Sequence, residues 1–176
     1  MRHQAIILKK QPLREDDELV MCYTRDFGKQ RYQAKSSVLA SSKQGTHLDV
    51  LNLIEFNLIE GKHHAIIASA AASNTFPRLK SSLPALAAAF FLLECFDKLV
   101  FENDHDPKLW RFLLDELTQL DAENEDIAGI QKRFLSVMGH GDSAQTEELA
   151  QRRFSSLMFF DTIQGHGKLQ DRTVAA

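Results

Sequence analysis

The spacing of apolar and polar residues changes once along this chain. In the first 70 residues, short runs rich in Val, Ile, Leu, Phe and Tyr lie between polar or glycine-containing turns, as β-strands do. This pattern predicts five strands, at residues 4–10, 18–24, 30–35, 50–60 and 65–70. In the fourth, Ile54, Phe56 and Leu58 alternate with Glu55 and Asn57, so one face is buried and the other solvated. Five strands in so short a length predict a small antiparallel barrel with an OB-fold.

After Pro77 the apolar residues recur at helical spacing. The first predicted helix runs from about residue 84 to 101, with an apolar stripe made of Leu86, Phe90, Leu93 and Val100. A second helix begins at Asp106 as N-cap, with Pro107 at its first position. Its apolar face is formed by Leu109, Leu113, Leu117 and Leu120. Shorter amphipathic helices are predicted near residues 126–138 and 146–163.

These patterns together predict an α+β protein of two domains. An N-terminal five-stranded OB-fold barrel occupies residues 1–75, and an all-helical C-terminal domain occupies residues 76–176. A chain of 176 residues is long enough to bury one well-filled core or two small ones.

The turn and strand at residues 24–35, TRDFGKQRYQAK, suggest a binding surface. Gly28 is the residue of the turn best suited to a positive φ. In the strand that follows, alternation places Tyr32 in the core and Lys29, Arg31 and Lys35 together on a solvated face. Cations at such spacing match successive phosphates of a single nucleic-acid strand, although solvated surface charges look the same in sequence. Tyr32 is favoured as a core residue over a base-stacking platform.

The formal charge is uneven along the chain. Residues 1–70 carry ten Lys and Arg against eight Asp and Glu, whereas residues 71–176 carry eleven against sixteen. A polyanion is therefore expected to meet the first part, and a protein partner the second. The lone Cys22 and Cys95 form no redox pair or zinc site and are expected to be small buried hydrophobes. No stretch has the length of a signal core or a membrane span, which predicts a cytoplasmic protein.

Catalytic and metal-binding signatures are weak. No G-x-S-x-G, H-E-x-x-H or G-x-x-x-x-G-K motif occurs in the chain. Adjacent His63 and His64 would point to opposite faces of a strand, and the histidines at 140 and 166 lie in glycine-flanked turns. The acidic run at residues 15–18 lacks the ligand spacing of a calcium loop and is expected to be a solvated, self-repelling loop. We expect no catalytic residues, no metal and no cofactor.

The order of these segments resembles the bacterial recombination-mediator family RecO. The similarity lies in AIILKKQPLREDDELVMCYTRDFGKQRYQAK at residues 5–35, in FLLDELTQL at 112–120, in QKRFLSVMGHG at 131–141 and in the tail LAQRRFSSLMFFDTIQGHGKLQDR at 149–172. The resemblance implies a non-enzymatic, nucleoid-associated protein that binds single- and double-stranded DNA, anneals complementary strands and helps to load RecA. It also implies binding to RecR and to the acidic C-terminal tail of single-stranded-DNA-binding protein.

Carried over by position, the resemblance implies five DNA-binding residues: Arg14, Lys29, Arg31, Lys35 and Lys43. Two departures from the family pattern stand out. The loop at 36–45, which is usually dense in Arg and Lys, supplies only Lys43, and the segment between Met138 and Thr146 lacks the family's longer insert, often a four-cysteine zinc ribbon.

An acidic, aromatic-ended peptide needs an apolar pocket beside a cation. The candidates for this partner site are Arg111, Lys132 and Arg133, whereas Trp110 is favoured as a core residue. The sparse basic loop leaves a second interpretation open, a protein-only repair adaptor that binds RecR or single-stranded-DNA-binding protein and has little DNA affinity of its own.

Overall fold

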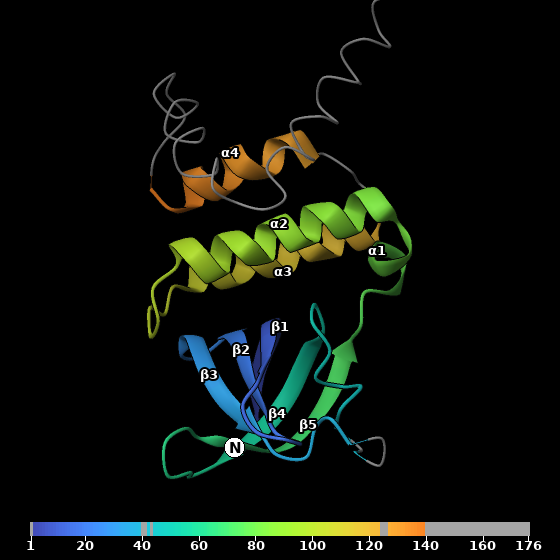
Figure 1. The fold of residues 1–176 in the computed structure, drawn as a ribbon. Helices are drawn as coiled ribbons and strands as arrows, with labels where there is room; N and C mark the ends of the chain where they lie inside the picture. The colour runs from blue at the N-terminus through green and yellow to red at the C-terminus, as the bar shows by residue number, and fades with distance from the viewer. Residues whose placement is uncertain (1, 40–41, 43, 124–126, 140–176) are drawn as a thin grey trace, which may run out of the picture. The chain divides into compact units, whose positions relative to one another are not determined.

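A computed structural model describes residues 2–39, 42, 44–123 and 127–139 of the chain. The strands are β1 (His3–Pro12), β2 (Glu18–Thr24), β3 (Gly28–Ala34), β4 (Leu53–Ile59) and β5 (Ile66–Asn74). They close into a barrel in the order β1-β2-β3-β5-β4, in which β3 and β5 are parallel and the other neighbours antiparallel (Figure 1). The five predicted strands are confirmed with shifted ends, and the closed barrel is consistent with an N-terminal OB-fold.

Tyr32, Ile54 and Phe56, which alternation predicted to be buried, lie in the interior of the barrel, and Leu58 is partly buried against them. The buried cluster contains Ala5, Ile7, Val20, Cys22, Tyr32, Ala34, Leu48, Ile54, Phe56 and Ile67. Tyr32 packs against Phe56 with ring centroids 5.5 Å apart, which confirms it as a core residue. Cys22 and Cys95 are both free and buried, and burial raises the pKa of each thiol, so they serve as the small hydrophobes that the sequence predicted.

Four helices follow the barrel in the described residues. They are α1 (Pro77–Ser81), α2 (Leu83–Leu99), α3 (Pro107–Asp121) and α4 (Ile127–Val137). The sequence predicted α2, α3 and α4 but not the short α1, and the helix predicted at 146–163 lies outside the described residues. The Asp106 N-cap is confirmed, since its carboxylate accepts a hydrogen bond from Lys108 N at 2.7 Å.

The predicted apolar stripe of α2 is only partly correct. Leu93 and Val100 are buried, but Leu86 and Phe90 are only partly buried. The most deeply buried positions of this helix are Ala85, Ala88, Ala89, Phe91, Leu92, Cys95 and Phe96. The predicted stripe rests on large apolar residues and omits the alanines. A helix that is apolar almost all round can bury any of its faces, so the large residues alone do not indicate the buried one. On α3, the predicted leucines at 109, 113, 117 and 120 are all buried, as expected.

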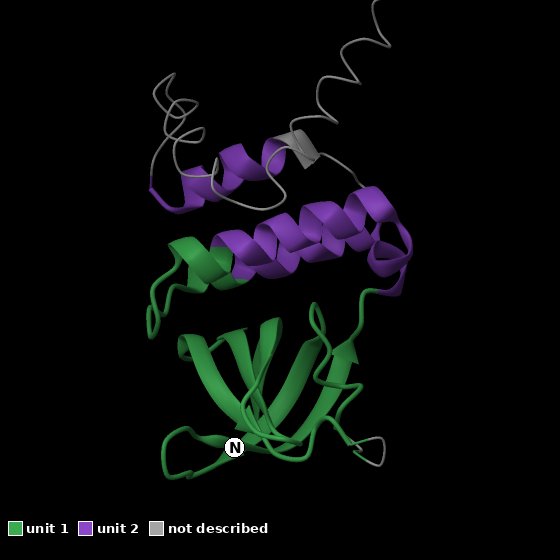
Figure 2. Cartoon of the chain, viewed as in Figure 1, with its two compact units in different colours: residues 1–76, 96–110 green, residues 77–95, 111–176 purple. Residues whose placement is uncertain are grey.

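The chain forms two compact units, which Figure 2 shows in green and purple. The first contains residues 1–76 and 96–110, and the second contains residues 77–95 and 111–176. The barrel unit thus includes the C-terminal end of α2, the loop after it and the start of α3. From the sequence, all of residues 76–176 were expected to form a helical domain. The hydrophobic period changes at Pro77, but it does not change again where residues 96–110 contact the barrel, so the sequence pattern could not predict that contact.

Candidate nucleic-acid interface

The turn between β2 and β3 is held by Thr24 and requires Gly28. Thr24 Oγ1 donates a hydrogen bond to Gly28 O at 3.0 Å and accepts one from Phe27 N at 2.9 Å. Gly28 has φ of 67°, as the sequence predicted, and a Cβ at this position would lie 2.0 Å from Asp104 O. Glycine is therefore needed twice, for the left-handed backbone and for the close approach of residue 104.

Lys29 does not lie on a solvated face, so the prediction for this residue is wrong. It is only 6% exposed, and its Nζ donates hydrogen bonds to Asp97 O at 2.7 Å and to Phe96 O at 3.3 Å. These are main-chain carbonyls at the C-terminal end of α2, where a cation complements the helix dipole. Burial lowers the pKa of Lys29, and the nearby Asp97 and Glu102 oppose that shift. The ammonium group therefore already donates hydrogen bonds to main-chain carbonyls of the same chain.

Arg31 also contacts its own chain. Its guanidinium group forms an ion pair with Glu102, although the side chain remains half-exposed. Next to this pair, Asn103 N donates a hydrogen bond to Lys29 O at 3.0 Å, and Lys9 pairs with Asp97 at 3.5 Å. We call residues 96–106 the covering segment, because it takes up cations that point outward from β1 and β3.

The outward side of β2 is occupied by the same segment. The Tyr23 ring packs edge-on against Phe96, with centroids 5.0 Å apart, and its hydroxyl lies 3.3 Å from Asp106 O and 3.5 Å from Asp104 O. Burial raises the pKa of Tyr23 to about 12; the hydrogen bond that Asp106 N donates to the Tyr23 oxygen at 3.4 Å opposes this shift, and the charges of Asp106 and Asp104 reinforce it. The part of the outward β2–β3 surface that holds Tyr23 and Lys29 is thus covered by residues 96–106, whereas Arg31 stays half-exposed; OB-fold proteins commonly use this surface for oligonucleotides.

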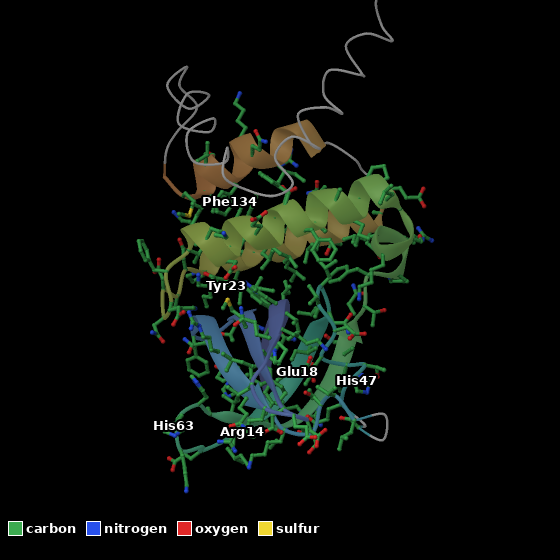
Figure 3. All side chains as sticks on the ribbon, viewed as in Figure 1. Arg14, Glu18, Tyr23, His47, His63 and Phe134 are labelled. Carbon is green, nitrogen blue, oxygen red and sulfur yellow. The ribbon has the colours of Figure 1, made fainter. Side chains whose placement is uncertain are left out.

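Arg14 and Lys35 are exposed at the other end of the barrel. Figure 3 shows Arg14 at this end, with His63, and Tyr23 at the opposite end. Both cations lie near the carboxylate of Asp17, whose pKa is lowered first by the backbone hydrogen bond from Ser36. Burial opposes this shift, while a hydrogen bond from Gln33 and the charges of Arg14 and Lys35 reinforce it. The charges of Arg14 and Lys35 thus act on the same carboxylate, and the predicted Lys43 lies outside the described residues.

The acidic run at residues 15–18 is more ordered than the sequence predicted. Asp17 accepts hydrogen bonds from Ser36 N at 2.9 Å and from Gln33 Nε2 at 2.8 Å. Glu18 accepts one from Ser37 Oγ at 2.8 Å and pairs with Lys10 at 3.4 Å. Half of the run thus ties the β1–β2 loop to the end of β3, and only Glu15 and Asp16 fit the solvated loop that we expected. Gln33 and Ser37 contribute side-chain donors, but Ser36 contributes its backbone N–H, which any residue except proline would offer, so the sequence carried little signal for this order.

The three partner-site candidates do not form one cluster of available cations. Arg133 Nε and Nη2 donate to the two carboxylate oxygens of Glu116 at 2.6 and 2.8 Å, which joins α4 to α3. Glu116 is buried, whereas Arg111 on α3 and Lys132 on α4 are exposed. Phe134 is fully buried against Phe112, and Trp110 is buried as predicted. Arg133 therefore has a structural partner, and its neighbour Phe134 lines no open pocket.

Comparison with known proteins identifies the family of this chain. Residues 1–76 match the family model described as recombination protein O N terminal. A DNA repair protein RecO of Desulforudis audaxviator is 30% identical over 140 residues, which cover 78% of this chain and 56% of the relative. This chain belongs to the RecO family. The RecO proteins of Cutibacterium acnes and Geobacter metallireducens are 29% and 25% identical, over 71% and 79% of this chain and 52% and 58% of their own lengths.

This RecO-family chain thus spans about half the length of the curated relatives it matches. The family model covers the barrel but stops before the covering segment, which nevertheless belongs to the same compact unit. Within the described ranges, no helix is long and apolar enough to cross a membrane, and no three His, Cys, Asp or Glu side chains are grouped as metal ligands would be.

Proposed function

We propose that this RecO-family chain is a DNA repair protein that binds DNA and anneals complementary single strands. The observation that carries this proposal is the match of the barrel, residues 1–76, to the N-terminal domain of recombination protein O. The names of its relatives, DNA repair protein RecO, support the same role. In this role the chain acts by binding, assists the loading of RecA indirectly, and contacts RecR and the acidic tail of single-stranded-DNA-binding protein.

The DNA contact is assigned to Arg14 and Lys35 at the end of the barrel opposite Tyr23. Both side chains are exposed, and the charges of both lower the pKa of the same carboxyl, Asp17, which supports a joint contact with one nucleic-acid strand. Two phosphate contacts on single-stranded DNA give a log-log salt slope of about −1.4, since each contributes about −0.7. Lys29 and Arg31 are left out of this site, because the covering segment occupies the first and pairs with the second.

One observation favours a second function, a protein-only adaptor with little DNA affinity. Outward cations of the barrel are paired with the chain's own acidic groups: Lys9 with Asp97, Lys10 with Glu18, and Arg31 with Glu102. Each such pair lowers the charge available to phosphates. On this alternative, the exposed Arg111 and Lys132 contribute to a site for RecR or for the acidic tail.

Titration of a fluorescent single-stranded oligonucleotide at two salt concentrations tests the proposal. The mediator predicts binding that weakens as salt rises, and the double substitution Arg14→Ala with Lys35→Ala is expected to reduce both the affinity and the slope. Lys98→Ala with Lys108→Ala is the matched control, because it removes the same charge from exposed positions of the barrel unit. Absence of binding at low salt would leave the adaptor, and an equal effect of both double variants would contradict the assigned site.

A further inference from the structure

Two aromatic side chains are exposed on neighbouring loops of the barrel unit. Phe101, between α2 and α3, is 78% exposed, and Phe27, in the β2–β3 turn, is 42% exposed. Gln30 links the two loops, since its Nε2 donates to Phe27 O at 2.7 Å and to Asn103 Oδ1 at 3.0 Å. The two rings are therefore presented by loops that are held to each other.

The loop that carries Phe101 is fixed after the aromatic residue. Asn103 N donates to Lys29 O at 3.0 Å, and Glu102 pairs with Arg31. His105 Nε2 donates to Arg25 O at 2.9 Å, which ties the same loop to the turn that carries Phe27. An exposed aromatic on a fixed backbone loses little conformational entropy when it is bound, so it is suited to anchor an interface.

Phe27 is likewise held in place. Its amide donates to Thr24 Oγ1 at 2.9 Å, and its ring lies against the ring of His3 with centroids 5.0 Å apart. His3 in turn packs against Phe56 of the barrel core, at 5.8 Å, so the contacts of Phe27 lead directly into the core. The half-exposed Phe27 ring is thus held in place by its packing against His3.

The charge around these aromatics is negative. Residues 24–28 and 100–106 together contain one arginine against four carboxylates, a formal charge of −3, and the carboxylates are Asp26, Glu102, Asp104 and Asp106. Arg31 offsets Glu102, and His3 lies 3.0 Å from Asp26. Lys98 and Lys108 flank the loop, so the negative charge left beside Phe101 is that of Asp104 and Asp106. Such a surface repels nucleic acid and complements a basic one. Aromatic anchors with a charged surround are also the composition of protein interfaces.

We propose that Phe27, Phe101 and the surrounding carboxylates form a docking surface for a protein partner whose contact segment combines apolar residues with Lys and Arg. This surface lies at the Thr24–Gly28 turn, at the opposite end of β2 from the loop that carries Arg14. A protein bound here leaves Arg14 and Lys35 open to another ligand. The inference stands independently of the DNA-binding proposal.

A displayed library of random short peptides, selected on the full chain, tests this surface. We expect the selected peptides to combine apolar residues with Lys or Arg. Phe101→Ala and Phe27→Ala should each weaken a selected peptide by about tenfold or more, as loss of an aromatic anchor does. Asp104→Lys should weaken peptide binding as well, because the substitution reverses a charge that is expected to meet the Lys or Arg residues of the peptide.

Val38→Ala is the matched control, since Val38 is a large exposed hydrophobe of the same unit on the loop after β3. Phe101→Ala carries the test alone if Phe27→Ala lowers the melting temperature. Selection of no peptide that needs Phe101 would overturn the proposal. So would a Phe101→Ala variant that loses affinity for a fluorescent oligothymidine and keeps its affinity for the peptide. Failure of the DNA-binding proposal shows instead as no oligonucleotide binding by the unmodified chain.

Discussion

Lys29 on β3 and Lys35 directly after this strand show how one residue type serves different purposes. Its ammonium group is buried and donates to two carbonyls at the end of α2, whereas Lys35, six residues later, is exposed. A buried lysine is tolerated only with good acceptors, because water no longer solvates the charge. Lys29 therefore stabilises the fold, and Lys35 is available to a ligand.

Replacing Lys29 by alanine is expected to lower the free energy of unfolding by about 2 kcal/mol, because charge-assisted hydrogen bonds to carbonyls contribute about that much. Lys35→Ala is the control and should change stability by less than about 0.5 kcal/mol. Urea denaturation followed by circular dichroism measures both values. Equal stabilities of the two variants would show that the Lys29 hydrogen bonds contribute nothing.

Tyr23→Phe is expected to cost about 1 kcal/mol at neutral pH, through loss of the hydroxyl's hydrogen bonds. A second effect appears in alkali. The pKa of Tyr23 is raised to about 12 in the folded chain. The contribution of the protonated hydroxyl to stability is therefore fully present below the unfolded pKa and is lost as pH rises from about 10 towards 12.

The variant should show a shallower alkaline loss of stability than the unmodified chain. Some loss remains in both, since burial also raises the pKa of Tyr32. Denaturant midpoints between pH 8 and 11 measure the difference, and the double variant Tyr23→Phe with Tyr32→Phe should lose more of the alkaline limb than Tyr23→Phe alone. An alkaline limb that Tyr23→Phe leaves unchanged would contradict the assignment.

At the scale of single elements, the side chains of β3 alternate as expected, but Lys29, which points away from the barrel interior, is buried and not solvated. Tyr32 and Ala34 face the barrel interior, and Lys29 and Arg31 point away from it. Alternation predicts which way a side chain points from a sheet, but it does not predict what lies on that side. Here the covering segment lies there, so outward residues are buried or paired.

The α3 and α4 helices are joined by the Glu116 and Arg133 pair, which gives an element-scale prediction. Arg133→Met removes both donors from a buried carboxylate and is expected to cost about 2 kcal/mol, because an unpaired charge is left where water cannot solvate it.

Adding Glu116→Leu to Arg133→Met should recover part of the lost stability, since an apolar pair can replace a buried ion pair. Thermal melts at pH 7 compare the single and double variants. A double variant that is less stable than the single one would argue against this interpretation of the pair.

On the scale of the whole molecule, the barrel unit is assembled from two separate stretches of chain. Residues 96–110 supply partners for Tyr23, Lys29 and Arg31, and Asp104 O fills the space that Gly28 leaves open. The unit that surrounds the candidate DNA site is thus completed by residues outside the range that the family model matches.

A fragment of residues 1–76 is expected to be much less stable than the full chain, with early exchange of the β2 and β3 amides. Without residues 96–110, the buried faces of Tyr23 and Lys29 meet water. Hydrogen exchange and thermal melting of the two proteins measure this. A fragment with a barrel as stable as that of the full chain would show that the covering segment adds nothing.

The sequence by itself determined the five strands, the positive φ of Gly28, the core position of Tyr32 and the N-cap at Asp106. These depend on residues near one another in the chain, through alternation, backbone freedom and local hydrogen bonds. The same local rules predicted that Lys35 is exposed, and the resemblance to RecO family proteins supplied Arg14 and predicted the family.

Only the tertiary structure decided which cations of the barrel remain available. Lys29 meets Asp97 O across 68 positions of sequence, and no local pattern encodes so distant a contact. The burial of a charge depends on what packs over it, and here that is residues 96–106, which return to the barrel after most of α2. The exposed pair Phe27 and Phe101 arises in the same way, because two distant loops become neighbours only when the chain is folded.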